Sequence, residues 1–148
     1  MTVRVADANR SHLAALEALE NVCFSLPWTR EQLESQLPDE RHVFLVAEGD
    51  DGQLLGYVGM MFVLDEGYIS NVAVTPSARQ RGIGHLLISE LEKRADGLAL
   101  SFMTLEVRAS NAPAIHLYSR HGFLPVGRRK NYYERPTEDA ILMTKMMK

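Results

Sequence analysis

The sequence predicts one α/β domain, residues 1–148, built on a mixed, mostly antiparallel sheet with helices on both faces. Three observations predict this class. Segments with the hydrophobic spacing of helices alternate with strand-like apolar runs along the whole chain. Three consecutive strands are joined by short polar turns, as in an antiparallel meander. A Gly-rich helix then joins the third of these strands to a later one, which fits a right-handed crossover between parallel strands.

The N-terminal part of the chain predicts a short strand followed by two helices. The strand lies near residues 3–5. The segment "RSHLAALEALENVC" predicts the first helix, because its apolar side chains recur at helical spacing, at Leu13, Leu16, Leu19 and Cys23. The segment "TREQLESQL" predicts the second helix, which opens with the pattern of a capping box between Thr29 and Gln32.

The rest of the chain predicts the meander, the crossover and the end of the sheet. The meander strands are "VFLVAE", "LLGYVGMMFV" and "YISNVAV". The crossover helix is "GIGHLLISELEKRA", and the parallel strand that follows is "LSFMTLEV". The segment "NAPAIHLYSRHGF" predicts a helix with Asn111 as N-cap, Pro113 in the first turn and Gly122 as C-terminal stop. Two last strands are predicted around "FLPVGRR" and "AILMTKMM".

Composition and charge exclude several classes of function. The sequence has no apolar run long enough to cross a bilayer and no secretory leader, so we expect a cytoplasmic protein without a membrane partner. We also expect a monomer, although no feature of the sequence fixes the oligomeric state. A net charge of -3 argues against a general binder of polyanions, and no direct nucleic-acid binding is expected. The single cysteine, Cys23, excludes an internal disulfide and is interpreted as a small core residue. The histidines lack metal-ligand spacing, so no metal is expected.

Two glycines at the start of the crossover helix indicate that bare backbone is needed there. Backbone N–H groups at a helix N-terminus, freed of side chains by Gly82 and Gly84 and assisted by Arg79 and Arg81, suit a pyrophosphate. The alternative is that the glycines only let the helix pack tightly on the sheet and that the arginines are solvated. No Gly-Lys-Ser/Thr sequence and no third glycine of a dinucleotide fingerprint follow. The glycines alone leave both interpretations open.

The segment "RQRGIG" resembles the Arg/Gln-x-x-Gly-x-Gly/Ala signature of the GNAT acetyltransferases. The likeness extends over nearly the whole chain to one branch, the RimI-type ribosomal-protein-alanine N-acetyltransferases, through "PWT", "NVAV", "LEVRASNAPAIHLYSRHGF" and "RRKNYY". This resemblance implies the GNAT fold, with a splayed pair of parallel strands. It also implies acetyl-CoA as cosubstrate and the N-terminal alanine of a small-subunit ribosomal protein as acceptor.

The resemblance also implies roles for individual residues. Glu106 matches the family's general base and Tyr118 its general acid. Trp28, Tyr132 and Tyr133 fall in segments that border the peptide entrance in that family. His85 stands where relatives often have a longer basic or polar residue. The residues that would contact the cofactor are Val72, Ala73, Val74, Gln80, Arg81, Gly82, Ile83, Gly84, His85 and Asn111.

The chemistry of acyl transfer is consistent with these roles. Transfer from a thioester by direct attack of an amine needs a deprotonated amine and a proton for the departing thiolate, with no covalent enzyme intermediate. Each residue also has an ordinary structural interpretation. Strand alternation places Glu106 opposite the apolar Leu105 and Val107, so it could lie on a solvated face. Tyr118 could be a core aromatic, and the three aromatic residues of the entrance could be ordinary packing.

Two other functions stay open on the sequence. The same chemistry could act on another amine, such as a lysine, a polyamine or an antibiotic. The domain could also bind acyl-CoA without catalysis, although the presence of both Glu106 and Tyr118 argues against this. The basic run of residues 128–130 is interpreted as a solvated strand end.

Overall fold

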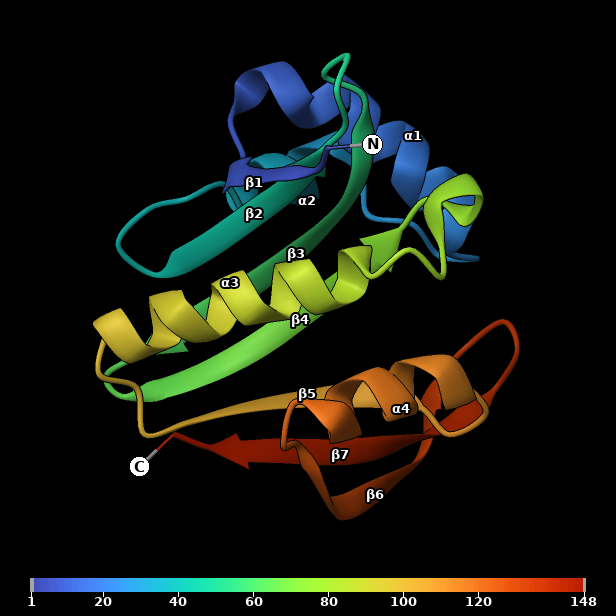
Figure 1. Cartoon of the computed structure of the whole chain (residues 1–148). Coiled ribbons are helices and arrows are strands. Elements are labelled where there is room, and N and C mark those ends of the chain that lie inside the picture. Colours follow the sequence, from blue (N-terminus) through green and yellow to red (C-terminus); the bar gives the residue numbers. More distant parts are fainter. Residues whose placement is uncertain (1, 148) are drawn as a thin grey trace.

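The structure is a computed structural model that describes residues 2–147, and it contains one seven-stranded sheet. The strand order is β1-β2-β3-β4-β5-β7-β6 (Figure 1). The strands are β1 Arg4–Asp7, β2 His42–Glu48, β3 Leu54–Val63, β4 Glu66–Val74, β5 Phe102–Arg108, β6 Leu124–Tyr133 and β7 Glu138–Met146. The helices are α1 Leu13–Cys23, α2 Arg30–Ser35, α3 Ile83–Gly97 and α4 Ala112–Arg120. Short 3-10 turns occupy Arg10–His12 and Pro76–Ala78. Within residues 2–147, no helix is long and apolar enough to cross a membrane.

The elements predicted from the sequence are confirmed, including their local signals. Thr29 and Gln32 form the reciprocal capping box of α2. The Asn111 side chain caps α4 by accepting a hydrogen bond from the N–H of Ala114. Gly122 follows α4 with a φ of 89°, the left-handed conformation that glycine adopts without strain.

Two hydrophobic cores lie on opposite faces of the sheet, so helices cover both faces as predicted. The alternation along β2 shows how one strand serves both cores. Val43, Leu45 and Ala47 pack with α3 and with the α4 side of the domain. Phe44 and Val46 pack with α1 and α2. Because every second side chain points to the same face, a strand buried on both sides reads as a continuous apolar run.

The sheet opens between its two central parallel strands. β4 and β5 pair only over residues 66–68 and 102–104, and their carboxyl-terminal halves separate (Figure 1). β4 also carries a β-bulge, because Gly59 of β3 pairs with Asn71 whereas Met60 pairs with Ile69, so the strand register skips Ser70. The Ser70 hydroxyl donates to the carbonyl of Gly59 at 3.2 Å. A bulge bends its strand and increases the local twist. The bulge therefore lies just where β4 leaves β5.

Candidate active site

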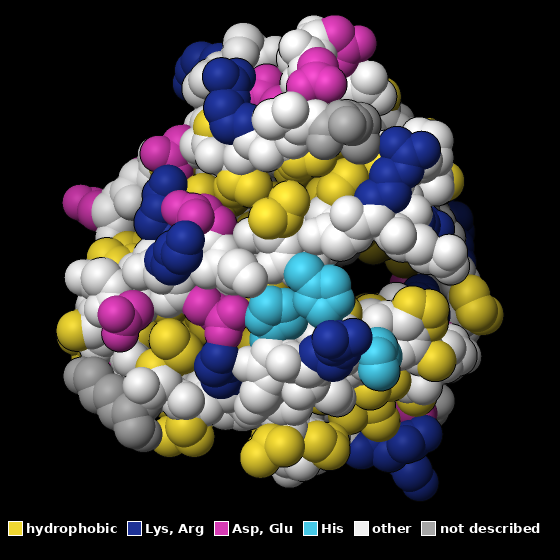
Figure 2. All heavy atoms as spheres, in the orientation of Figure 1, with side chains coloured by type: hydrophobic (Ala, Val, Ile, Leu, Met, Phe, Trp, Pro, Cys, Tyr) yellow, Lys and Arg dark blue, Asp and Glu magenta, His cyan; other side chains and the backbone are white. Residues whose placement is uncertain are grey.

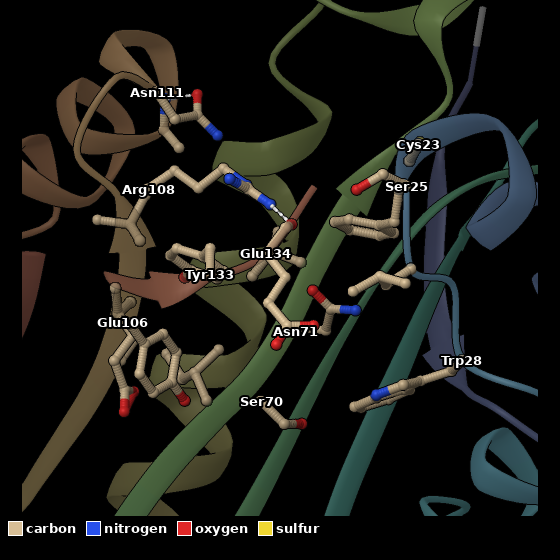
Figure 3. A pocket seen from close by; sticks show the side chains of 18 of the residues that line it. Cys23, Ser25, Trp28, Ser70, Asn71, Glu106, Arg108, Asn111, Tyr133 and Glu134 are labelled. Carbon is tan, nitrogen blue, oxygen red and sulfur yellow. Dashed lines mark hydrogen bonds between the residues drawn. The ribbon is translucent and has the colours of Figure 1, made fainter. Parts of the chain in front are cut away.

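A cavity of about 720 Å³ fills the space between the separated halves of β4 and β5. Its walls come from segments far apart in the sequence: β4, β5, the start of α4, the residues between α1 and α2, and the connection from β6 to β7 (Figure 3). Among the residues implied by the family resemblance, those in its lining are Trp28, Val72, Glu106, Asn111, Tyr118, Tyr132 and Tyr133. The fold thus brings both proposed catalytic residues and all three entrance aromatics to one cavity.

The β4 backbone beside this cavity is unpaired on its β5 side beyond Tyr68. Val72 lines the cavity, whereas the side chain of Ala73 packs in the core on the α1 side. The carbonyl of Val74 accepts a hydrogen bond from Arg79 Nε at 3.1 Å. Backbone N–H and C=O groups on an open strand edge can pair with an extended ligand. This edge is where the resemblance places the pantetheine arm.

The two glycines of the signature have different structural reasons. Gly82 adopts a left-handed φ of 79°, and a Cβ atom at this position would meet no other atom within 4 Å. A Cβ atom at Gly84 would lie 3.0 Å from a methyl group of Leu117 in α4. The close approach at Gly84 is therefore between two helices, α3 and α4. Gly84 thus allows close packing, as the second interpretation expected, but α3 packs there on α4 and not on the sheet.

The turn from Gln80 to Gly82 leads into an uncapped helix N-terminus. Gln80 has a left-handed φ of 64°, and no side chain caps α3 at Gly82. The first N–H groups of a helix have no intrahelical acceptor and carry the positive end of the helix dipole. The open space at Gly82 and these donors, at Ile83 and its successors, fit an anionic group such as a pyrophosphate. Arg79 is turned back onto β4 and the Cys23 sulfur, 3.6 Å away.

His85 is held toward the end of α4. Its Nδ1 atom lies 2.9 Å from Nε2 of His121, whose Nδ1 atom lies 2.8 Å from a carboxylate oxygen of Glu92. Figure 2 shows histidine side chains gathered on this face, beside a hollow between the α3 and α4 sides of the molecule. The two rings therefore link the helices that flank the hollow.

Glu106 lies on the cavity wall with an incompletely paired carboxylate. Its side chain is only 7% exposed, so the alternative of a solvated strand face is wrong. Arg129 Nε lies 3.4 Å from Oε1, whereas Oε2 is buried and accepts no hydrogen bond from residues 2–147. Burial, together with the neighbouring Glu106 and Tyr132, raises the pKa of Tyr68 at the same wall. A buried carboxylate oxygen without a donor is costly, and such groups occur where a ligand or a proton completes them.

Tyr118 combines a core ring with an available hydroxyl group. The residue is buried, and its ring packs against Phe123 at a centroid distance of 5.9 Å. The Tyr118 side chain lines the cavity. Its hydroxyl makes no hydrogen bond with any residue in the range 2–147. Burial, and to a lesser degree Tyr133, raises the pKa of Tyr118. The hydroxyl therefore stays protonated and is able to donate.

The outer rim of the cavity is fixed by Arg108 of β5. Its guanidinium group donates to the carbonyl of Glu134 at 2.9 Å and to the carbonyl of Pro136 at 2.9 Å. The same group lies 4.5 Å from the ring centre of Tyr133, a cation–π contact, and Tyr133 meets Tyr132 edge to face. One arginine thus contacts both the connection that follows β6 and Tyr133, the last residue of that strand.

Sequence reasoning missed a buried polar group in the cavity wall, centred on Glu20. Glu20 is 1% exposed, lines the cavity, and bonds Tyr57 and Asn71. A signal for it was present, since residues 13, 16, 20 and 23 also follow helical spacing and a glutamate occupies the third position. A charged residue on the buried stripe of a helix needs partners, and these come from other segments.

The comparisons with known proteins agree with this geometry. Residues 13–123 match the model of the acetyltransferase (GNAT) family. The chain belongs to the GNAT acetyltransferase family. Members of this family use acetyl-CoA. Within residues 2–147 of this GNAT domain, no group of three His, Cys, Asp or Glu residues is arranged to hold a metal ion.

Three relatives show how far the likeness of this GNAT protein extends. A [ribosomal protein bS18]-alanine N-acetyltransferase from Salmonella typhimurium is 36% identical over 135 residues, covering 88% of each chain. The crystal structure of the ribosomal-protein-S18-alanine N-acetyltransferase from Escherichia coli superposes with a TM-score of 0.91 at 30% identity, covering 99% of this chain and 94% of that one. Arabidopsis thaliana NAA60 in complex with acetyl-CoA superposes with a TM-score of 0.89 at 25% identity, covering 98% of both chains.

Proposed function

We propose that this GNAT protein transfers the acetyl group of acetyl-CoA to the N-terminal alanine amine of a small-subunit ribosomal protein. The cavity carries the proposal, because Glu106, Tyr118 and the aromatic rim share one space between the separated strands. The activity named for the Salmonella and E. coli relatives supports this acceptor. We further propose that residues 1–148 form a single domain that acts in the cytoplasm as a monomer.

The α3 N-terminus, the open edge of β4 and the Asn111 side chain would each bind a part of acetyl-CoA. The turn and first helical residues, Gln80 to His85, would hold the pyrophosphate on the α3 N-terminus. The open edge of β4 at Val72, Ala73 and Val74 would pair with the pantetheine arm. The Asn111 side chain is occupied as the cap of α4 through its oxygen, so its amide nitrogen is the group left to contact the cofactor.

Acetyl-CoA supplies an activated acyl group as a thioester. Glu106 accepts a proton from the acceptor amine, directly or through one water, and its unpaired Oε2 is the oxygen available for this. A C–N bond forms, the C–S bond breaks, and Tyr118 donates its hydroxyl proton to the departing sulfur. An acceptor that enters as an ammonium loses two protons, one to Glu106 before the attack and one to solvent after it. Solvent then returns the proton from Glu106 to Tyr118, which restores both groups.

The acceptor peptide would enter past Trp28 on one side and Tyr132 and Tyr133 on the other. A terminal amine has a pKa near 8 and a lysine near 10.4, so at pH 7 about a tenth of an N-terminus is neutral but well under a thousandth of a lysine. An N-terminal amine is therefore the easier acceptor for a single carboxylate base.

The test offers the pure protein acetyl-CoA with short peptides that begin with Ala, Ser, Met and Gly, with a lysine peptide blocked at its N-terminus, and with a polyamine. Release of free thiol measures turnover. We expect Ala and Ser peptides to be acetylated fastest, because a confined site excludes larger first side chains by overlap. If the blocked lysine peptide or a polyamine is the better substrate, the alanine assignment fails and an acetyltransferase of other amines replaces it.

A further inference from the structure

Glu20 is a buried carboxylate whose oxygens are already occupied by donors. Its Oε1 atom accepts a hydrogen bond from the N–H of Trp28 at 2.7 Å. Its Oε2 atom accepts from the Tyr57 hydroxyl and from Asn71 Nδ2, the latter at 3.3 Å. Asn71 Nδ2 also donates to the Tyr57 hydroxyl at 2.8 Å. Burial raises the pKa of Glu20, against the effect of the Tyr57 and Trp28 hydrogen bonds.

These contacts close a loop in the cavity wall. The residues between α1 and α2 line the cavity with Phe24, Ser25, Leu26 and Trp28. The segment leaves α1 through the ordinary backbone hydrogen bond of the last helical turn, from the N–H of Phe24 to the carbonyl of Glu20 at 3.0 Å. Its far end is held by the Glu20 carboxylate, which accepts from the N–H of Trp28. Leu26, between the two ends, is 50% exposed.

The same carboxylate fixes the orientation of the Asn71 amide. A carboxylate only accepts hydrogen bonds, so the amide nitrogen of Asn71 must face Glu20, and its oxygen Oδ1 must face the other way. Figure 3 shows Asn71 projecting from β4 into the cavity, with its amide oxygen on the side away from α1. Asn71 lies beside the bulge at Ser70, where β4 leaves β5. Its oxygen is thus an oriented acceptor on the cavity wall.

We propose that Glu20 is a positioning residue for the acceptor site, which holds the Trp28 segment in place and turns Asn71 Oδ1 toward the incoming amine or the first peptide N–H. This inference rests on the proposed function, in which a peptide amine enters past Trp28. Glu20 does not itself take the proton, because its two oxygens already accept three hydrogen bonds. An ammonium or amide N–H of the acceptor is the kind of group that Asn71 Oδ1 would bind.

The test compares Glu20→Gln with Glu17→Gln, a matched change on the exposed side of the same helix, where Glu17 pairs with Arg30. A glutamine at position 20 keeps the side-chain volume but turns one acceptor into a donor, which then faces N–H and O–H donors. We expect the KM for an Ala-starting peptide to rise by about 5- to 30-fold, the range for one to two buried hydrogen bonds. The affinity for acetyl-CoA should change less than twofold.

A second measurement needs no substrate. Trp28 is the only tryptophan of the chain, so intrinsic fluorescence reports the position of this segment directly. Glu20→Gln should shift the Trp28 emission to longer wavelength and increase its quenching by acrylamide, and Glu17→Gln should do neither. If Glu20→Gln unfolds the protein, Tyr57→Phe replaces it, because the phenyl ring keeps the packing and removes one donor to Glu20.

Three outcomes would overturn the inference. Unchanged Trp28 fluorescence and unchanged peptide KM in a folded Glu20→Gln protein would show that the contacts position nothing. A loss of kcat that recovers as pH rises would make Glu20 a proton acceptor. Equal losses of affinity for peptide and for acetyl-CoA would indicate general packing. If the wild type acetylates no alanine peptide, the proposed function fails, and the fluorescence result still decides whether Glu20 holds the segment.

Discussion

Replacing Glu106 with Gln tests the assignment of the general base most directly. The side chain is 7% exposed, so the variant must fit without strain. The structure allows this, because the amide oxygen of Gln can face Arg129 at the position of Oε1. The amide nitrogen then takes the position of Oε2, which accepts no hydrogen bond from residues 2–147. We therefore expect the variant to fold with a Tm close to that of the wild type.

The expected loss of activity follows from the need for a general base and for a neutral acceptor amine. Removing a positioned general base lowers kcat/KM by about 10² to 10⁴, which is about 3 to 5 kcal/mol of the barrier. Without the base, the reaction depends on amine that is already neutral. That fraction rises from about a tenth at pH 7 to about nine tenths at pH 9. The deficit of Glu106→Gln relative to the wild type should therefore shrink by roughly tenfold over this range.

The assay is thiol release from acetyl-CoA at saturating cofactor, with an Ala-starting peptide, at several pH values from 7 to 9. Glu66→Gln is the matched control, since this exposed glutamate begins β4 and does not line the cavity. It should keep the wild-type rate and profile. A Glu106→Gln protein with the wild-type rate at pH 7, or with a deficit that stays constant up to pH 9, would refute the base assignment.

Three further predictions follow from the other parts of the site. Tyr118→Phe should lower kcat about 10²-fold or more without recovery at high pH, because the thiolate still lacks a proton donor; a pH–rate profile checks this. Gly82→Asp should weaken acetyl-CoA binding in calorimetry at unchanged peptide affinity, because it adds a negative charge to open space at the α3 N-terminus. Hydrogen bonds from Ser110 and then the Arg108 guanidinium lower the pKa of Glu138. Its stabilising effect is therefore present above the unfolded-state pKa near 4.3 and lost as pH falls through the lower folded-state pKa. Glu138→Gln should lower the Tm at pH 7, and the difference from the wild type should vanish in acid.

The sequence alone predicted the helices and strands, and it predicted which side of β5 carries Glu106. Alternation in "MTLEVR" places Leu105 and Val107 in the core and Glu106 on the opposite side of β5, and the structure confirms that pattern. Alternation depends only on local backbone geometry, so it can be predicted without tertiary information. The sequence alone cannot predict whether the Glu106 side of β5 is solvated or enclosed. This depends on α1, α4 and the β6–β7 connection, which close the cavity from distant parts of the chain.

The contacts between side chains of distant segments could not be predicted from the sequence either, because they depend on the tertiary packing. The need for glycine at position 84 comes from Leu117, more than thirty residues later, and no local pattern names that partner. The β-bulge at Ser70 is likewise not marked by a glycine or a proline within the predicted strand "YISNVAV". A motif can therefore indicate that backbone must be bare, but the group that approaches it is a property of the packed structure.

The two carboxylates of the cavity wall show why geometry must precede pKa in assigning a base. Judged by burial alone, Glu20 would be the candidate, because desolvation raises its pKa and a carboxylate with a raised pKa accepts protons well. Its oxygens, however, already accept hydrogen bonds from Trp28, Tyr57 and Asn71, so an acceptor amine could reach them only by displacing a donor. Glu106 is also buried, yet one of its oxygens has no donor within residues 2–147. A base must be able to contact the proton that it removes. The number of donors already bound therefore supports our proposal that Glu106 transfers the proton and that Glu20 positions the acceptor site.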